Sequence, residues 1–143
     1  MIKNFEQYLK ENLAQKRSPN PTEASSLMNK AVRRLKYIKM QKIDAFTAEF
    51  IFEDNYETMR EAIQSLMELK GYKPYSHEVL VAFLIEFSKI SKPEILSFDR
   101  YRALRNNAVY RAERISSETC EESLKFLEKF MSELKKEFER RLT

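Results

Sequence analysis

The chain has 143 residues, of which 43% are hydrophobic and 34% are charged, with a formal net charge of +4. This length and balance are typical of one globular domain with a charged surface rather than of a disordered tail. The single glycine, Gly71, excludes the glycine-rich loops of P-loop and dinucleotide-binding folds and argues against tight β-hairpins. The mildly basic balance is, taken alone, only weak evidence for a nucleic-acid partner.

Cysteine and histidine each occur once, as Cys120 and His77. These counts exclude an internal disulfide, a thiolate zinc cluster and a two-histidine metal site, so we expect no metal and no cofactor. A lone thiol suits a reducing compartment and predicts a cytoplasmic location. The longest apolar stretch, near Val79–Phe87, is far shorter than the ~20 residues of a membrane span, and the first residues lack the apolar core of a signal peptide. We therefore expect a soluble protein with no membrane partner.

Apolar residues recur at three- and four-residue spacing along most of the chain, which predicts an all-α single domain of about five amphipathic helices in up-down order. The helical segments are predicted at residues 2–16, 21–41, 44–70, 77–90, 94–114 and 117–142. The boundary between the second and third segments is weakly marked, so they form either two helices or one kinked rod. Asn20 and Ser116 are expected to cap helices, and Gly71 to end one. No segment shows the alternation of a β-strand.

Charge is unevenly distributed between the second and third segments. Residues 30–42 contain six basic side chains and no acidic one, whereas residues 44–61 contain six acidic side chains and one basic one. One interpretation is two solvated faces that neutralise each other across an antiparallel helix pair. The other is a basic patch, centred on Arg33 and Arg34, that binds phosphate backbones.

The richest group of polar side chains lies in the segment 99–111. At about 100° per residue, Arg102, Asn106 and Tyr110 lie along one side of a helix, with Arg105 about 60° from Arg102. Guanidinium groups can grip a phosphate, while an asparagine and a tyrosine ring can orient and stack on a base. The alternative is a solvated face whose arginine stems cover apolar neighbours. The residues predicted to face the core from this segment are Leu104, Ala108 and Ala112.

Two stretches resemble a known family. The stretch 50–84, FIFEDNYETMREAIQSLMELKGYKPYSHEVLVAFL, is similar to the central helices of HEPN domains (higher eukaryotes and prokaryotes nucleotide-binding), and the later LRNNAVYRAERIS is similar to their signature helix. The resemblance extends over about residues 27–138. It implies a helical bundle that forms a homodimer with the signature helices facing each other. Many members are metal-independent ribonucleases, and many pair with a small nucleotidyltransferase.

The resemblance places the motif arginine of the family at Arg105 and the polar residue after it at Asn106. The motif histidine corresponds to Tyr110, and Ala112 stands where some members carry a tyrosine. A histidine, with a reference pKa of about 6.5, suits proton transfer near neutral pH, whereas a tyrosine has a reference pKa of about 10. The resemblance therefore implies a binding site more strongly than it implies cleavage.

The leading hypothesis is an RNA- or nucleotide-binding protein that acts with a nucleotidyltransferase in a toxin–antitoxin-like pair. Its binding residues are predicted to be Arg102, Arg105, Asn106, Tyr110, Arg33 and Arg34. One rival hypothesis is a metal-independent ribonuclease that uses Arg105 and Tyr110 as catalytic residues. The other is a purely structural interaction module. His77 is expected to pack or hydrogen-bond locally, and Cys120 to fill the core.

Overall fold

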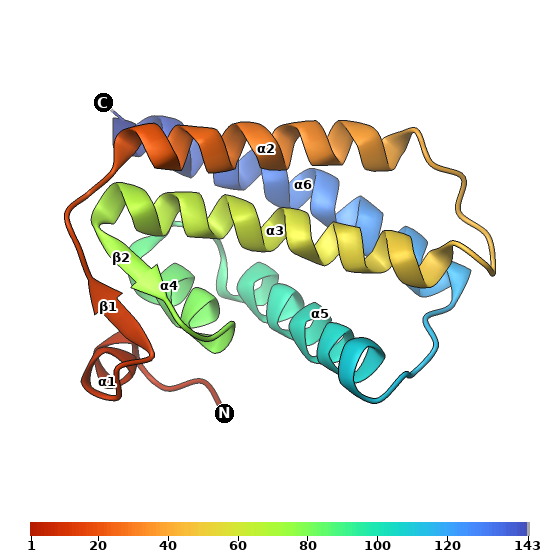
Figure 1. Ribbon diagram of the computed structural model, residues 1–143, viewed down its shortest axis with the longest axis horizontal. Coiled ribbons are helices and arrows are strands. Elements are labelled where there is room, and N and C mark those ends of the chain that lie inside the picture. The colour runs from red at the N-terminus through yellow and green to blue at the C-terminus, as the bar shows by residue number, and fades with distance from the viewer. Residues whose placement is uncertain (143) are drawn as a thin grey trace.

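The computed structural model describes residues 1–142, which form a helical bundle with one very small sheet (Figure 1). The helices in this range are α1 (Phe5–Lys10), α2 (Pro21–Lys39), α3 (Ala48–Lys70), α4 (Glu78–Phe87), α5 (Lys92–Tyr110) and α6 (Ser117–Leu142). The strands are β1 (Ala14–Lys16) and β2 (Tyr72–Pro74). The four long helices α2, α3, α5 and α6 alternate in direction along the chain. The prediction of an all-α, up-down, single-domain bundle is confirmed.

The helix ends follow from local chemistry. The Asn20 side chain accepts a hydrogen bond from the Glu23 amide at 3.0 Å, and Pro21 takes the first position of α2, where no amide hydrogen is needed. Helix α3 ends at Gly71, whose φ of +91° lies in the left-handed region. A side chain at Gly71 would collide with the carbonyl oxygen of Arg17, so only glycine fits this position.

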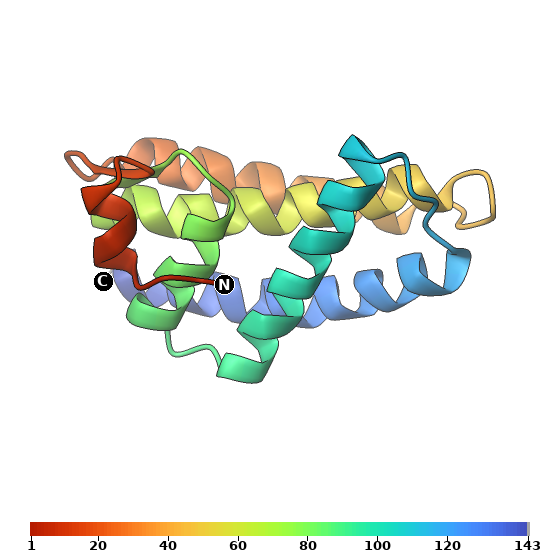
Figure 2. The same cartoon turned by 90° about the horizontal axis from the view of Figure 1, so that it is seen from below.

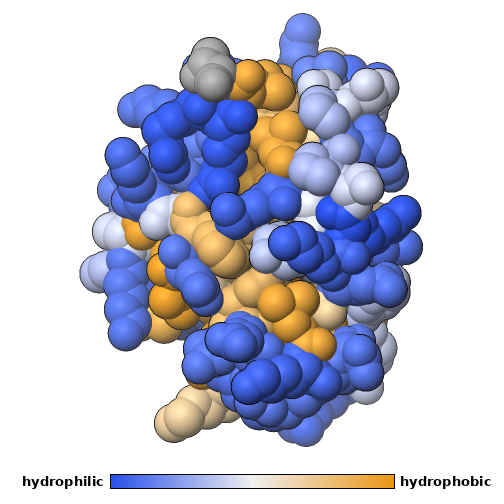
Figure 3. Space-filling view, turned by 90° about the vertical axis from the view of Figure 1, so that its left-hand side faces the viewer, coloured by the Kyte–Doolittle hydropathy of each residue, from blue (hydrophilic) through white to orange (hydrophobic). Residues whose placement is uncertain are grey.

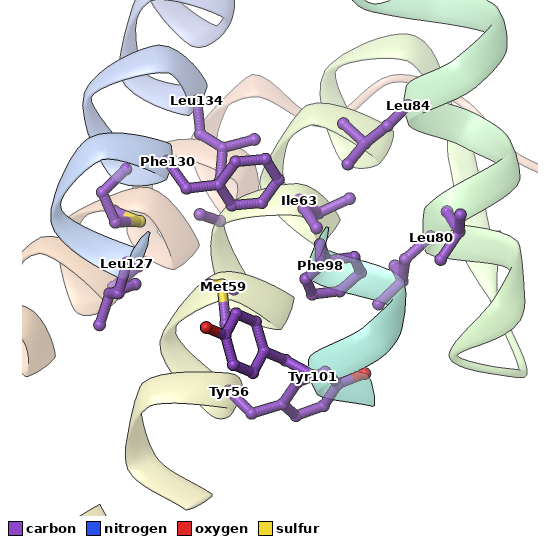
Figure 4. Packing of buried hydrophobic residues seen from close by; sticks show 14 of the residues in the cluster. Tyr56, Met59, Ile63, Leu80, Leu84, Phe98, Tyr101, Leu127, Phe130 and Leu134 are labelled. Carbon is purple, nitrogen blue, oxygen red and sulfur yellow. The ribbon is translucent and has the colours of Figure 1, made fainter. Parts of the chain in front are cut away.

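Helix α3 lies in the middle of the bundle, between α2 on one side and α5 on the other, with α6 packed along it (Figures 1 and 2). Helix α5 crosses α3 and α6 obliquely. Phe98 of α5 stacks against Tyr56 of α3, with ring centroids 5.6 Å apart, and against Phe130 of α6, at 5.8 Å (Figure 4). All three side chains are fully buried, so this aromatic stack fixes the position of α5 against the core.

The first predicted helix is wrong over much of its length. Helix α1 stops at Lys10, and Asn12 takes a left-handed φ of 61°. The next residues form β1, which pairs antiparallel with β2, so the prediction of no strand is also wrong. The apolar spacing of residues 2–16 alone suggests one helix. The pairing with β2 instead provides hydrogen-bond partners for the backbone N–H and C=O groups of β1. The segment after β2 is also hydrogen-bonded to residues in and next to β1. The Tyr75 amide donates to the Leu13 carbonyl at 2.8 Å, and the Tyr75 hydroxyl donates to Gln15 Oε1 at 2.9 Å.

Two further boundaries differ from the prediction. Helix α5 ends at Tyr110 rather than near residue 114, because Ala112 has a left-handed φ of 55°; Ala112 is exposed and does not face the core as predicted. Helices α2 and α3 are two helices rather than one kinked rod. The Asp44 carboxylate accepts hydrogen bonds from the Phe46 and Thr47 amides, both at 2.9 Å, and so shapes the turn before α3.

The end of the bundle that carries α1 and the β1–β2 pair has a mixed surface (Figure 3). Polar side chains cover most of it, and apolar surface shows between them. Within residues 1–142, no helix combines the length and the apolar character needed to cross a membrane.

Candidate functional site

Arg105 is a half-buried cation on α5 held between two aromatic rings. Its guanidinium carbon lies 5.6 Å from the centre of the Tyr56 ring and 5.9 Å from that of Tyr110. Its only hydrogen bond within the described part of the chain is a long one, 3.4 Å from Nη1 to Asn106 Oδ1. No carboxylate in residues 1–142 approaches it within 4 Å. The structure thus brings together three of the predicted residues, and most of the guanidinium donors of Arg105 have no partner.

Arg102 lies on the same helix but differs in its pairing. Its Nε donates to Asp99 Oδ1 at 2.7 Å, and its side chain is only 15% exposed. The neighbouring carboxylate offsets part of its charge and holds the side chain in one orientation. Arg102 therefore adds to the local positive field with fewer free donors than Arg105.

His77, which immediately precedes α4, is placed against this group by Tyr56. The two rings are parallel within 8°, and the Tyr56 hydroxyl lies 2.7 Å from His77 Nδ1. Burial raises the pKa of Tyr56, so its hydroxyl keeps its proton. That proton has no other acceptor within residues 1–142, and we infer that it is donated to Nδ1. The neutral imidazole then carries its own hydrogen on Nε2, which acts as a donor.

Three arginines contribute to the electrostatic environment of His77. Burial lowers the pKa of His77, and the positive charges of Arg105, Arg60 and Arg102 lower it further, with Glu57 acting in the opposite direction. His77 is therefore neutral at neutral pH. We call the group Arg60, His77, Arg102, Arg105, Asn106 and Tyr110 the arginine–histidine site; it joins α3, the start of α4 and α5.

Sequence reasoning missed the part of this site outside α5. His77 was expected to pack or hydrogen-bond locally; it packs against the ring of Tyr56, and its hydrogen bond reaches the same residue, 21 residues earlier in the chain. Periodicity predicts which face of one helix a residue occupies, but not which residue of another helix lies opposite. The one signal in the sequence was that His77 is the sole histidine and directly precedes a helix.

A small pocket lies beside His77. It has a volume of about 240 Å³ and is lined by side chains of α3, the segment after β2 and α4. Arg60, at its edge, donates to Glu57 Oε1 at 2.6 Å from Nε and to Gln64 Oε1 at 2.6 Å from Nη1. The positive charge of Arg60 is thus partly offset, while its position next to His77 is well defined.

The other predicted arginines lie elsewhere. Arg33 and Arg34 belong to α2, and α3 lies between α2 and α5 (Figures 1 and 2). Arg34 donates to both carboxylate oxygens of Glu61, at 3.0 and 3.2 Å, and the Glu61 side chain is only 4% exposed. Arg33 is exposed. The structure therefore does not bring these two arginines beside Arg105, and it gives Arg34 a structural contact.

This difference predicts unequal effects of two matched substitutions on stability. Arg34→Ala removes the bidentate partner of a buried carboxylate and is expected to lower the free energy of unfolding by about 1–3 kcal/mol. Arg33→Ala is expected to change it by no more than ~0.5 kcal/mol. Urea denaturation of both variants measures the difference. Equal effects would contradict a structural role for Arg34.

Comparison with family models, with curated proteins and with solved structures finds no match to this chain. Within residues 1–142, no three side chains of histidine, cysteine, aspartate or glutamate come together in an arrangement that could hold a metal ion. The functional argument therefore depends on the residues of the site itself.

Proposed function

We propose that the protein binds RNA or a nucleotide through phosphate groups at the arginine–histidine site. The observation that carries this proposal is the half-buried guanidinium of Arg105, which has no carboxylate partner within residues 1–142. Glu53 is the carboxylate that feels Arg105, whose positive charge acts against the rise in the Glu53 pKa caused by burial, but no ion pair within 4 Å joins the two side chains. A partly buried cation without a direct ionic partner is costly, so protein cations in such positions are usually paired. A phosphate would supply the missing negative charge, and its oxygens would accept hydrogen bonds from the free N–H groups of the Arg105 guanidinium.

The other members of the site support the same class of ligand. The Nε2 hydrogen of His77 offers a neutral donor beside the arginines, and the ring of Tyr110 is 75% exposed and can stack on a base. The side chain of Asn106 can turn from Arg105 towards a ribose or base. A guanidinium, a donor-bearing imidazole and an exposed aromatic ring are the parts from which single-stranded nucleic-acid sites are commonly built.

The resemblance to HEPN domains supports a finer version of this proposal. In it, two copies of the chain pair with their α5 helices facing each other, and a nucleotidyltransferase is the protein partner in a toxin–antitoxin-like pair. Helix α5 carries three exposed apolar side chains, Leu96 at 48%, Val109 at 40% and Tyr110 at 75%, which would lie at or near such a contact. The whole chain would then be one HEPN-like domain.

RNA cleavage is a second candidate function, favoured by two proton-bearing groups of the site, the Tyr110 hydroxyl, whose ring contacts Arg105, and the His77 imidazole, which contacts Tyr56. In such a reaction the ribose 2′-oxygen attacks the adjacent phosphorus and the bond from phosphorus to the 5′-oxygen breaks. The proton of the 2′-hydroxyl ends on the 5′-oxygen, which leaves a 2′,3′-cyclic phosphate and a 5′-hydroxyl. Arg105 would stabilise the charge on phosphorus in the transition state. Nδ1 of His77 is occupied by Tyr56, which favours binding over cleavage.

A salt titration of RNA binding tests the main proposal. A labelled single-stranded RNA is expected to bind at low salt, and the logarithm of the association constant is expected to fall linearly with the logarithm of the salt concentration. The slope should be about −0.7 for each phosphate contacted. Absence of binding at low salt would favour a structural interaction module instead. Product formation in the same mixture with a metal chelator present would establish cleavage.

A further inference from the structure

Helix α2 has two apolar sides, and only one of them is covered by the rest of the described structure. The covered side, which includes Ala31 and Ile38, is buried where α2 packs on α3. The other side carries Val32, Leu35 and Met40, which line a common pocket. Val32 and Met40 are exposed, and Leu35 is half-buried. A helix that faces only solvent on its second side would normally be polar there.

This second side of α2 forms one wall of a groove shared with α6. Helices α2 and α6 both pack mainly on α3 and have few contacts with each other. A pocket of about 360 Å³ on α2 and one of about 350 Å³ that extends onto α6 have Leu35 in common, and the buried Met131 adds apolar surface on the α6 side. At 1.5 Å per residue, the lining segments 32–40 and 128–139 are roughly 12 and 17 Å long, or two to three turns of a helix. We call this hollow the α2–α6 groove.

The walls of the groove are mainly basic. Its charged side chains are four lysines and two glutamates: Lys36, Lys39, Lys135, Lys136, Glu128 and Glu139. Glu128 lies 3.9 Å from Lys39 across the groove. The other three lysines form no ion pair within 4 Å in residues 1–142, although Lys136 interacts with Glu133 at longer range. The groove therefore combines an apolar floor with positive charges that are largely unpaired.

The shape and chemistry of the groove restrict what it can bind. No aromatic ring of the described residues lines it, so it offers nothing on which an RNA base could stack. Its floor consists of leucine, valine and methionine side chains, which suit aliphatic groups, and methionine adapts readily to a partner's shape. A hollow two to three turns long fits a narrow convex element such as a helix better than a flat bilayer.

We propose that the α2–α6 groove binds an acidic amphipathic helix of a partner protein. Aliphatic side chains at positions i, i+3, i+4 and i+7 of that helix would lie on Val32, Leu35 and Met131. Its carboxylates would lie beside Lys36, Lys135 and Lys136, where charge complementarity favours an acidic helix over a basic one. The inference does not depend on phosphate binding at Arg105, because α3 separates α2 from α5.

The test uses a pair of synthetic peptides of about 15 residues, each held helical by a side-chain cross-link. One carries leucines at the stated spacing with glutamates beside them, and its twin carries lysines in place of the glutamates. Fluorescence anisotropy with the full chain is expected to show binding of the acidic peptide that is at least about tenfold tighter than that of the basic one. Equal affinities, tighter binding of the basic peptide or no binding of the acidic one would overturn the proposal without affecting RNA binding.

Two variants separate the apolar and the charged contributions. Val32→Gln removes apolar surface at an exposed position without a change in charge and keeps a good helix former, so it is expected to weaken the acidic peptide about fivefold. The double variant Lys36→Glu with Lys135→Glu is expected to abolish or reverse the preference for the acidic peptide. Arg111→Glu is the matched control, because it reverses a charge at an exposed position just after α5, and it should leave the ratio of the two affinities unchanged.

Two further measurements distinguish other occupants of the groove. Analytical ultracentrifugation compares the oligomeric state of the wild type with that of Val32→Gln, and sedimentation with phosphatidylserine-containing vesicles compares their membrane binding. We expect Val32→Gln to change neither. Loss of self-association in the variant would assign the groove to a second copy of the chain, and loss of vesicle binding would assign it to a membrane surface. Either loss would overturn the proposed partner helix.

Discussion

Replacement of Arg105 by alanine is expected to weaken binding of a short single-stranded RNA about 10- to 150-fold. The guanidinium is the half-buried group with most of its donors free, so it should make the strongest contacts to phosphate. Hydrogen bonds to a charged group contribute roughly 1.5–3 kcal/mol, and each 1.4 kcal/mol corresponds to a factor of ten in affinity. The salt dependence should also become shallower by about one phosphate contact. Fluorescence anisotropy at several salt concentrations measures both changes.

Two further variants make this result specific. Arg105→Lys keeps the positive charge but loses the planar guanidinium group, so the affinity of this variant for RNA should lie between those of the wild type and Arg105→Ala. Arg100→Ala is the matched control, because Arg100 is exposed on another side of α5, where its guanidinium lies over the Tyr101 ring. Equal losses from Arg100→Ala and Arg105→Ala would show that the RNA responds to net charge alone and would contradict a defined site at Arg105.

Phe98→Ala is expected to have the largest effect on stability, a loss of about 3–5 kcal/mol in the free energy of unfolding. Phe98 is fully buried between Tyr56 and Phe130, and its removal leaves a cavity where α5 meets α3 and α6. Such a loss is a large part of the roughly 5–15 kcal/mol by which a domain of this kind is usually stable. Urea or thermal unfolding followed by circular dichroism measures it.

Phe50→Ala serves as the control for this substitution. The Phe50 side chain is 58% exposed, and its ring contact is with Phe46, which is itself 80% exposed. The change in the free energy of unfolding should be below about 1 kcal/mol. Comparable losses from Phe98→Ala and Phe50→Ala would contradict the packing shown in Figure 4.

The long helices could be predicted from the sequence because their signals are local. Helix α2 begins at the Asn20 cap and Pro21, α3 ends at Gly71, and the predicted range of α6 agrees with Ser117–Leu142. These ends depend on side chains a few residues away. The segment Ala14–Lys16 could not be predicted, because its partner strand lies almost sixty residues further along the chain.

The site was predictable only within one helix. The spacing placed Arg102, Asn106 and Tyr110 along one side of α5, with Arg105 near Arg102. In the structure Arg105 contacts Asn106 and Tyr110, whereas Arg102 pairs with Asp99. The approach of His77 depends on how Tyr56 of α3 meets the start of α4. The charge pattern of residues 30–61 left two interpretations open. Arg34 and Lys30 both contact Glu61, at 3.0 and 3.5 Å, which is the neutralisation expected across an antiparallel pair. Arg33 remains exposed on the same helix, so part of the basic surface is still accessible.

The pairing of β1 with β2 has a practical consequence for work on this protein. Four residues, 13–16, hold the segment that carries Tyr75 and His77, through the pairing of β1 with β2 and through the hydrogen bonds from Tyr75 to Leu13 and Gln15. A substitution within residues 13–16 that breaks this pairing would therefore displace Tyr75 and reshape the pocket beside His77, even with every side chain that lines the pocket intact.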